Sequence, residues 1–194
     1  MATPEQDRAT VLSTAYQATI KSIQGNTSLS GEGKRIAIAK QYVATKDQLT
    51  ALSEQQTTKS RKRQADLERN LFGLRANAPT VDTVSYRDAL DRVSNLDWQD
   101  GSAPRDLDRM YTNAQLSADT ILTKAILSQA FAARLEPLVE RYIADNPAAE
   151  ADVVELWTAQ ASTTNLVDNW AFVIYKPSEL GALDDTTIRA LAEG

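Results

Sequence analysis

The sequence predicts an all-α protein, a helical bundle built around one long central helix. Through most of the chain, apolar residues recur at the spacing that places them on one face of a helix. The seven glycines fall between these periodic segments or at the end of the chain, and only one of the six prolines interrupts a helical pattern. No pair of strand-like segments is visible, so nothing in the pattern favours a sheet.

The first helix is predicted to begin after Thr3 and to end at Gly25-Asn26. Thr3 is a favourable N-cap, Pro4 suits the first helical position, and Gln6 can complete a capping box with Thr3. The predicted apolar face consists of Leu12, Tyr16, Ile20 and Ile23.

A long N-terminal helix is predicted over about residues 32–72, where its first half carries an apolar face and Gly73 supplies a stop. The stretch 53–66 is almost free of apolar residues, and a helix that is polar all round bridges solvent, contacts a partner or frays. We therefore expect either an arm that projects from the body or a hinge in this stretch. The predicted domains are an N-terminal helical hairpin with its arm (1–78) and a helical core domain (79–194).

The central helix of the bundle is predicted at about residues 104–143. Its residues between Ile121 and Phe131 are apolar over most of the helix circumference, which is typical of a buried helix. Pro137 should kink or divide it, because proline removes one internal hydrogen bond and clashes with the preceding turn. Before it, a short helix is expected to begin at Ser85.

A further helix is expected after Asn146, because apolar residues continue at helical spacing as far as Ile174. The run WAFVIY at 170–175 is compatible with a helix or with a buried strand, and the lack of a second strand to pair with it favours the helix. Asp184 should cap a last short helix, with Leu183 and Ile188 as a hydrophobic staple.

The composition argues against several classes of site. The chain has no cysteine and no histidine, which excludes disulfides, thiolate nucleophiles and the commonest general base and transition-metal ligand. We therefore expect no enzyme activity, no catalytic residue, no cofactor and no metal site. A net charge of -5 argues against a general nucleic-acid binder. No apolar run is long enough to span a membrane and no signal peptide precedes the first helix, so we expect no membrane association.

Two motifs resemble functional sites and fit a structural role better. The loop GNTSLSGEGKR at 25–35 has Ser28 where a phosphate-binding loop requires glycine, and Arg35 where that loop requires Ser or Thr. We interpret it as a flexible loop between helices. The carboxylate pairs at 106/108 and 184/185 stand at expected helix starts, where aspartate caps the helix and favours its dipole.

The one basic cluster lies in the polar stretch of the long helix. It is compatible with a solvated helix face, with a contact to an acidic protein surface, or with nucleic acid, which is the least favoured because no aromatic residues interleave with it. Apolar residues that follow the cluster could dock the helix onto a neighbouring protein. The candidate protein-interaction residues are Lys59, Arg61, Lys62, Arg63, Leu67, Leu71 and Phe72.

One segment suggests a family. The sequence LERNLFGL at 67–74 ends a long helix rich in Gln, Lys and Arg, within a chain rich in Ala, Thr and Asp. In these features the chain resembles small helical structural proteins of tailed bacteriophages. The resemblance implies a place in the virion, at its head, or in the host cytoplasm during assembly. It also implies other copies of the chain and capsid, portal or scaffold-type proteins as partners, and it brings no catalytic residue.

These features together predict a non-enzymatic structural or assembly protein that acts in many copies through helix-mediated contacts. The alternative is a cytoplasmic helical adaptor or regulatory protein that uses the same arm to bind one cellular protein.

Overall fold

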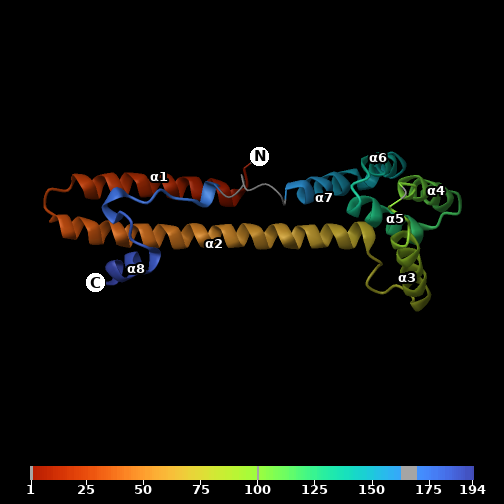
Figure 1. The fold of residues 1–194 in the computed structure, drawn as a ribbon, viewed down its shortest axis with the longest axis horizontal. Helices are drawn as coiled ribbons and strands as arrows, with labels where there is room; N and C mark the ends of the chain where they lie inside the picture. The colour runs from red at the N-terminus through yellow and green to blue at the C-terminus, as the bar shows by residue number, and fades with distance from the viewer. Residues whose placement is uncertain (1, 100, 163–169) are drawn as a thin grey trace. The chain divides into compact units, whose positions relative to one another are not determined.

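The computed structural model describes residues 2–99, 101–162 and 170–194, and these residues form an all-helical fold that confirms the predicted class (Figure 1). The described residues contain no strand. The α-helices are α1 (Pro4–Gly25), α2 (Gly31–Phe72), α3 (Thr80–Ser94), α4 (Ala103–Leu116), α5 (Thr120–Ala132), α6 (Glu136–Asp145), α7 (Glu150–Ser162) and α8 (Asp185–Glu193). Short 3₁₀ segments lie at Pro147–Ala149, at 170–172 and at Ser178–Leu180.

The chain divides into two compact units, with a boundary that falls inside α2. The first unit holds the described residues of Met1–Ser60 and Asn165–Gly194, and the second holds those of Arg61–Thr164. This division differs from the expected one after residue 78. The reason is that the two parts of α2 belong to different hydrophobic cores, and that the C-terminal residues join the core of the first unit.

The long helix is present as predicted, because α2 runs without a break from Gly31 to Phe72. At a rise of 1.5 Å per residue its length is about 60 Å. Gly73 ends it: its N–H donates to the carbonyl oxygen of Arg69 at 2.9 Å. A Cβ at position 73 would lie 2.5 Å from that oxygen, so this close approach requires glycine.

The start of α1 also follows the prediction. The N–H of Gln6 donates to the Thr3 hydroxyl at 3.2 Å, and the N–H of Thr3 donates to the Gln6 side chain at 2.7 Å, which completes the capping box. The Thr3 hydroxyl donates in turn to the Gln56 side chain at 2.6 Å. The N-terminus of α1 is thereby attached to α2.

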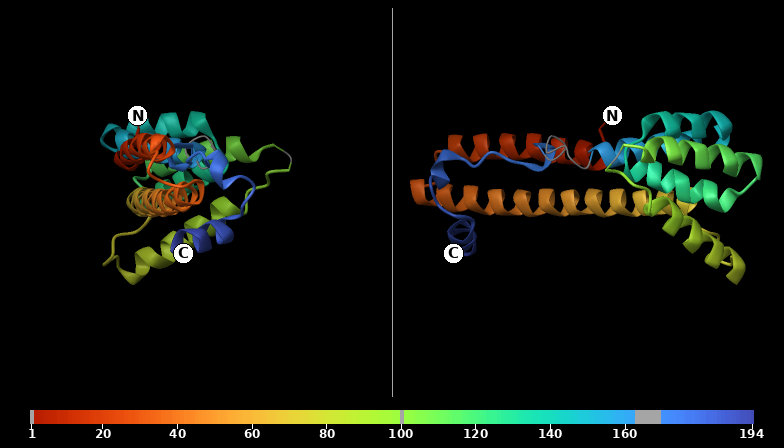
Figure 2. Two further views of the ribbon diagram at one scale, coloured as in Figure 1. Left: turned by 90° about the vertical axis from the view of Figure 1, so that its left-hand side faces the viewer. Right: turned by 45° about the vertical axis from the view of Figure 1, so that its right-hand side comes forward.

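In the first unit, α1 and the first part of α2 lie side by side and run in opposite directions (Figure 2). Their apolar faces share one core with residues from the C-terminal end of the chain. The buried members of this core are Tyr16, Ile20, Ile38, Ala39, Tyr42, Leu180 and Ile188. This core and the hydrogen bond between Thr3 and Gln56 attach the first part of α2 to its own unit, so it is not a free arm.

Polar contacts reinforce the attachment of the C-terminal residues. The Tyr16 hydroxyl donates to the carbonyl oxygen of Tyr175 at 3.0 Å. Lys46 pairs with Asp185 at 2.5 Å, and Arg189 pairs with Asp47, so that two ion pairs join α8 to α2. As predicted, the Asp184 side chain caps α8 by accepting from the N–H of Thr187 at 2.8 Å.

The second unit has its own core. The end of α2 and the helices α3 to α7 contribute side chains to it. Phe131 of α5 lies at the centre of this core and is 2% exposed. Its ring makes edge-to-face contacts with the rings of Phe72 and Trp157, with centroid distances of 5.2 and 5.1 Å. The other large, fully buried side chains of this core are Leu67, Val93, Leu107, Tyr111, Ile126, Leu127 and Leu156.

The segment 104–143 is divided into α4, α5 and α6, so the prediction of one central helix is wrong in this respect. Ala118 and Arg134 interrupt it with φ values of 54° and 56°, in the left-handed region. Asp119 then caps α5 by accepting from the N–H of Leu122 at 2.9 Å. Pro137 stands in the first turn of α6, where its missing N–H costs nothing, rather than inside a longer helix.

Two other boundaries and the secondary structure of one run differ from the prediction. The short helix begins at Thr80, before the expected Ser85, because the residues after Pro79 already take helical geometry. The helix expected to reach Ile174 ends at Ser162, and 170–172 is a 3₁₀ segment followed by irregular chain to residue 177. The run WAFVIY is therefore neither an α-helix nor a strand, and Val167, one residue of the expected helical face, lies outside the described residues.

Candidate protein-interaction site

Two of the four residues in the predicted basic cluster form ion pairs within their own unit. Lys59 donates to a Glu5 carboxylate oxygen at 2.5 Å. The Glu5 side chain is 5% exposed, whereas that of Lys59 is 61% exposed. The hydrogen bond from Lys59 lowers the pKa of Glu5 below its ordinary value, because the ammonium group stabilises the ionised carboxylate. Lys59 therefore neutralises a buried charge of α1.

Arg63 forms ion pairs in the second unit with two half-exposed carboxylates. Its Nε and Nη2 donate to the two carboxylate oxygens of Glu155 at 2.7 and 2.6 Å, and Nη2 also lies 3.4 Å from Asp152. This two-pronged arrangement lowers the pKa of Glu155 and joins α2 to α7.

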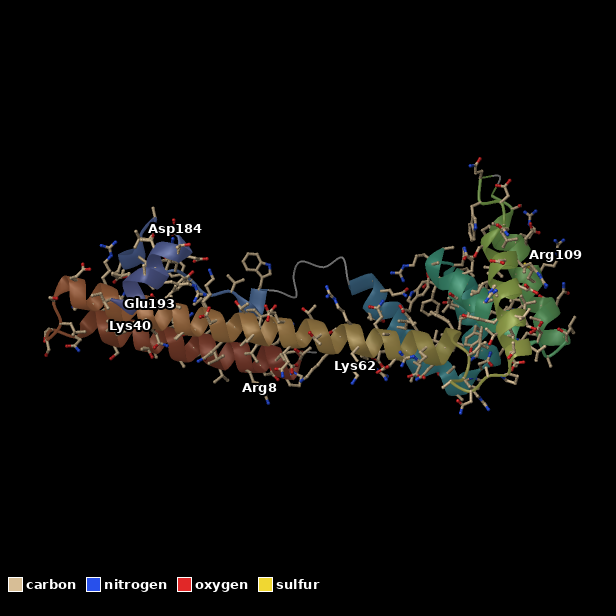
Figure 3. The ribbon with its side chains drawn as sticks, turned by 90° about the horizontal axis from the view of Figure 1, so that it is seen from below. Arg8, Lys40, Lys62, Arg109, Asp184 and Glu193 are labelled. Carbon is tan, nitrogen blue, oxygen red and sulfur yellow. The ribbon has the colours of Figure 1, made fainter. Side chains whose placement is uncertain are left out.

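The other two basic residues, Arg61 and Lys62, are exposed and form no ion pair with the described residues. Lys62 is labelled on α2 in Figure 3. Of the four cations in the predicted cluster, these two are available to an acidic partner.

The three apolar candidates lie in the core of the second unit. Leu67 is fully buried, Leu71 is 6% exposed, and Phe72 packs edge-to-face on Phe131. Their side chains bind α2 to the helices of its own unit, so the surface for a partner has to be sought elsewhere.

An apolar groove lies in the first unit, between α1 and α2, with a volume of about 850 Å³. Val11, Leu12, Ala51 and Leu52 supply its apolar surface, and the Val11 side chain is 69% exposed. The polar residues that line it are Asp7, Arg8, Gln48 and Gln55. Arg8 is labelled in Figure 3.

The groove lies on a different side of α2 from the face that packs against the described C-terminal residues. Gln48, Ala51 and Gln55 stand three and four residues apart, so they share one face of α2. At 3.6 residues per turn, Ala39 and Tyr42, which share a core with Leu180 and Ile188, point to a different side of that helix.

A second exposed apolar set comes from the run WAFVIY. The side chains of Trp170, Val173 and Tyr175 are 73%, 62% and 77% exposed. Ile174, between two of them, packs against the core of the first unit and holds this stretch on it. Several large apolar side chains of the first unit therefore face solvent, which is typical of surfaces that bind other proteins.

The remaining sequence motifs have structural roles. In the loop before α2, the Ser30 hydroxyl accepts from the N–H of Gly33 at 3.0 Å, so the loop serves as a helix start. Asp106 pairs with Arg109 at 3.0 Å, and Asp108 pairs with Arg141 at 2.7 Å. In the part of the chain that the structure describes, no three Asp or Glu side chains gather into a set that could hold a metal ion.

The groove was not predicted, although the sequence contains a signal for it. Val11 stands beside Leu12, one position off the predicted apolar face of α1, and therefore widens that face toward solvent. On α2, Leu52 belongs to the predicted apolar face, and Ala51 stands beside it. An apolar residue directly beside the face on which two helices pack is the pattern that would have indicated the groove.

Comparisons with known proteins bring no relative: no family model, no curated protein and no solved structure matches this chain. None of the helices in the described ranges is long and apolar enough to cross a membrane.

Proposed function

We propose that this chain is a non-enzymatic structural or assembly protein that works in many copies and contacts its partners through the apolar surface of the first unit. The assembly that its sequence resemblance suggests is the head of a tailed-phage virion. The partners are then other copies of the chain and a capsid, portal or scaffold-type protein.

The observation that carries this proposal is the apolar surface that the first unit leaves exposed. Val11 in the groove and the tryptophan and tyrosine of the run WAFVIY are each more than two-thirds exposed, at 69%, 73% and 77%. Aromatic side chains of this kind are enriched at the centres of protein interfaces, where they contribute a large share of the binding free energy. Arg61 and Lys62 can add an electrostatic contact with an acidic partner.

The resemblance to phage proteins supports a place in the phage head. It does not support the choice of the apolar surface of the first unit as the contact surface. Its segment, 67–74, includes three side chains that belong to or pack against the core of the second unit, those of Leu67, Leu71 and Phe72. The docking role expected of Leu67, Leu71 and Phe72 therefore passes, in this proposal, to the exposed residues of the first unit.

Sedimentation velocity tests the proposal, on the purified full chain alone over a range of concentrations and then mixed with purified head proteins. The expected result is a sedimentation coefficient that rises with concentration, or a complex with at least one head protein. A chain that stays monomeric and binds none of them would contradict the proposal. Binding to a single cellular protein outside any particle would instead support the adaptor alternative.

A further inference from the structure

A second cavity lies in the second unit, where two stretches that are distant in the sequence, 74–82 and 120–124, meet. Its volume is about 800 Å³, within the range of about 300–1,000 Å³ that small-molecule sites occupy. The loop after α2, the first turn of α3 and the first turns of α5 enclose it. The lining residues used below are Leu74, Arg75, Pro79, Asp82, Ile121 and Lys124.

Two cations line this cavity from different elements. The Lys124 ammonium donates to the carbonyl oxygen of Gly73 at 2.5 Å, which holds it in place and leaves two of its N–H groups for another acceptor. Arg75 is exposed and forms no ion pair with the described residues. Burial, followed by the charge of Arg75, lowers the pKa of Lys124 below its ordinary value. Both cations line the same cavity, so their positive charges face one space.

The start of α3 borders the same cavity through Pro79 and Asp82. Pro79 is the N-cap of this 15-residue helix and offers no side-chain hydrogen bond. The N–H groups of the first turn have no acceptor inside the helix, and the helix dipole makes this end attractive to anions. Asp82 lines the cavity as well, so the side chains bring two positive charges and one negative charge.

We infer that this cavity binds a small dianionic oxyanion of the phosphate class, with Arg75 and Lys124 as its charge partners. A dianion placed between the two cations replaces their repulsion by two attractions, and a tetrahedral oxyanion has enough oxygen atoms to accept from both cations and from the backbone. Leu74, Pro79 and Ile121 offer apolar surface beside the charged part. The chemistry therefore fits a free phosphate ion or the phosphate group of a small organic ester.

Isothermal titration calorimetry of the full chain at constant ionic strength tests this inference, with inorganic phosphate, phenyl phosphate and acetate as the three probes. We expect phosphate to bind. Acetate, a monoanion, should bind with an affinity at least about tenfold lower. Tighter binding of phenyl phosphate than of phosphate identifies an organic ester as the better occupant, and equal binding identifies the free ion.

Matched variants locate the site. Arg75→Gln and Lys124→Gln should each weaken phosphate binding about tenfold or more, and Asp82→Asn should strengthen it, because it removes the one negative charge. Arg87→Gln is the control: Arg87 is an exposed arginine of α3 that does not line the cavity. Arg75 is in an exposed loop, so its variant keeps the fold even if Lys124→Gln does not. The inference is overturned if phosphate does not bind the wild-type chain, or if Arg87→Gln weakens binding as much as Arg75→Gln.

Discussion

Lys59 of α2 donates to the Glu5 carboxylate of α1 across 2.5 Å, and it is the acid, not the base, that is buried. Fifty-four positions separate the two residues in the sequence. The exposed stem of Lys59 gives its helix the appearance of a free basic face, whereas its charge stabilises a carboxylate inside the first unit. This pairing has a consequence that depends on pH.

Lys59→Met should destabilise the first unit at neutral pH, because it leaves the Glu5 carboxylate buried without its partner. The folded-state pKa of Glu5 is lowered, so the stability from the pair is present above the ordinary glutamate pKa and is lost as pH falls through the folded value. Thermal unfolding from neutral pH to about pH 3 should therefore show a Tm difference that shrinks on acidification. The double variant Glu5→Gln/Lys59→Met should recover part of the loss. A Tm difference independent of pH would contradict this account.

Leu67→Ala should destabilise the second unit by about 2–5 kcal/mol, because it opens a cavity in a closely packed core. Leu116→Ala, at a side chain that is 84% exposed, should change stability by no more than about 0.5 kcal/mol. Urea unfolding of the two variants measures both values. If Leu67→Ala kept full stability and abolished partner binding, Leu67 would be a docking residue, as the sequence first indicated.

Ala118→Gly should stabilise the second unit by up to about 1 kcal/mol, since alanine is strained at a φ of 54° and glycine is not. The same substitution at Ala65, an exposed position inside the part of α2 that belongs to the second unit, should cost about 1 kcal/mol, because glycine is a poor helix former. The two variants should thus shift the urea midpoint in opposite directions. A loss at both positions would show that Ala118 does not break the helix.

Alkaline pH should destabilise the first unit through Tyr16. Burial raises the pKa of its hydroxyl well above the ordinary value, and the hydroxyl donates to the Tyr175 carbonyl oxygen. The folded pKa is the higher one, so this contribution is complete below the unfolded pKa of about 10 and is lost as pH rises toward the folded value. Thermal unfolding of Tyr16→Phe between neutral pH and about pH 11 should show a smaller decline than that of the wild-type chain. An equal decline would assign the effect to other groups.

The sequence predicted the parts of the fold that depend on local chemistry. Thr3 with Gln6 marks a helix start, Gly73 a helix stop and Asp184 a cap, and each acts on backbone groups within four residues of itself. The breaks at Ala118 and Arg134 escaped prediction because the apolar spacing continues across them in helical register. The cap at Asp119 was the local signal for the first break.

The exposed surface proposed for protein contacts was harder to predict, because it depends on how residues from different helices pack against one another. A basic cluster on a helix gives no sign that a residue from another helix will neutralise part of it, as Glu5 does for Lys59 and Glu155 for Arg63. Periodicity likewise does not tell which core an apolar face will join. The residues at 170–175 are plainly apolar in the sequence. Their spacing does not show that Ile174 packs on the core of the first unit while Trp170 and Tyr175 face solvent.

The central claim, that the exposed apolar surface of the first unit makes the protein's contacts, is tested most directly by two valine variants. Val11 and Val81 are 69% and 67% exposed, one in the groove of the first unit and the other on α3 of the second. Sedimentation velocity should show that Val11→Glu lowers the affinity of self-association, or of binding to a head protein, about tenfold or more. Val81→Glu should leave that affinity unchanged. Equal behaviour of the two variants and the wild-type chain would contradict the claim.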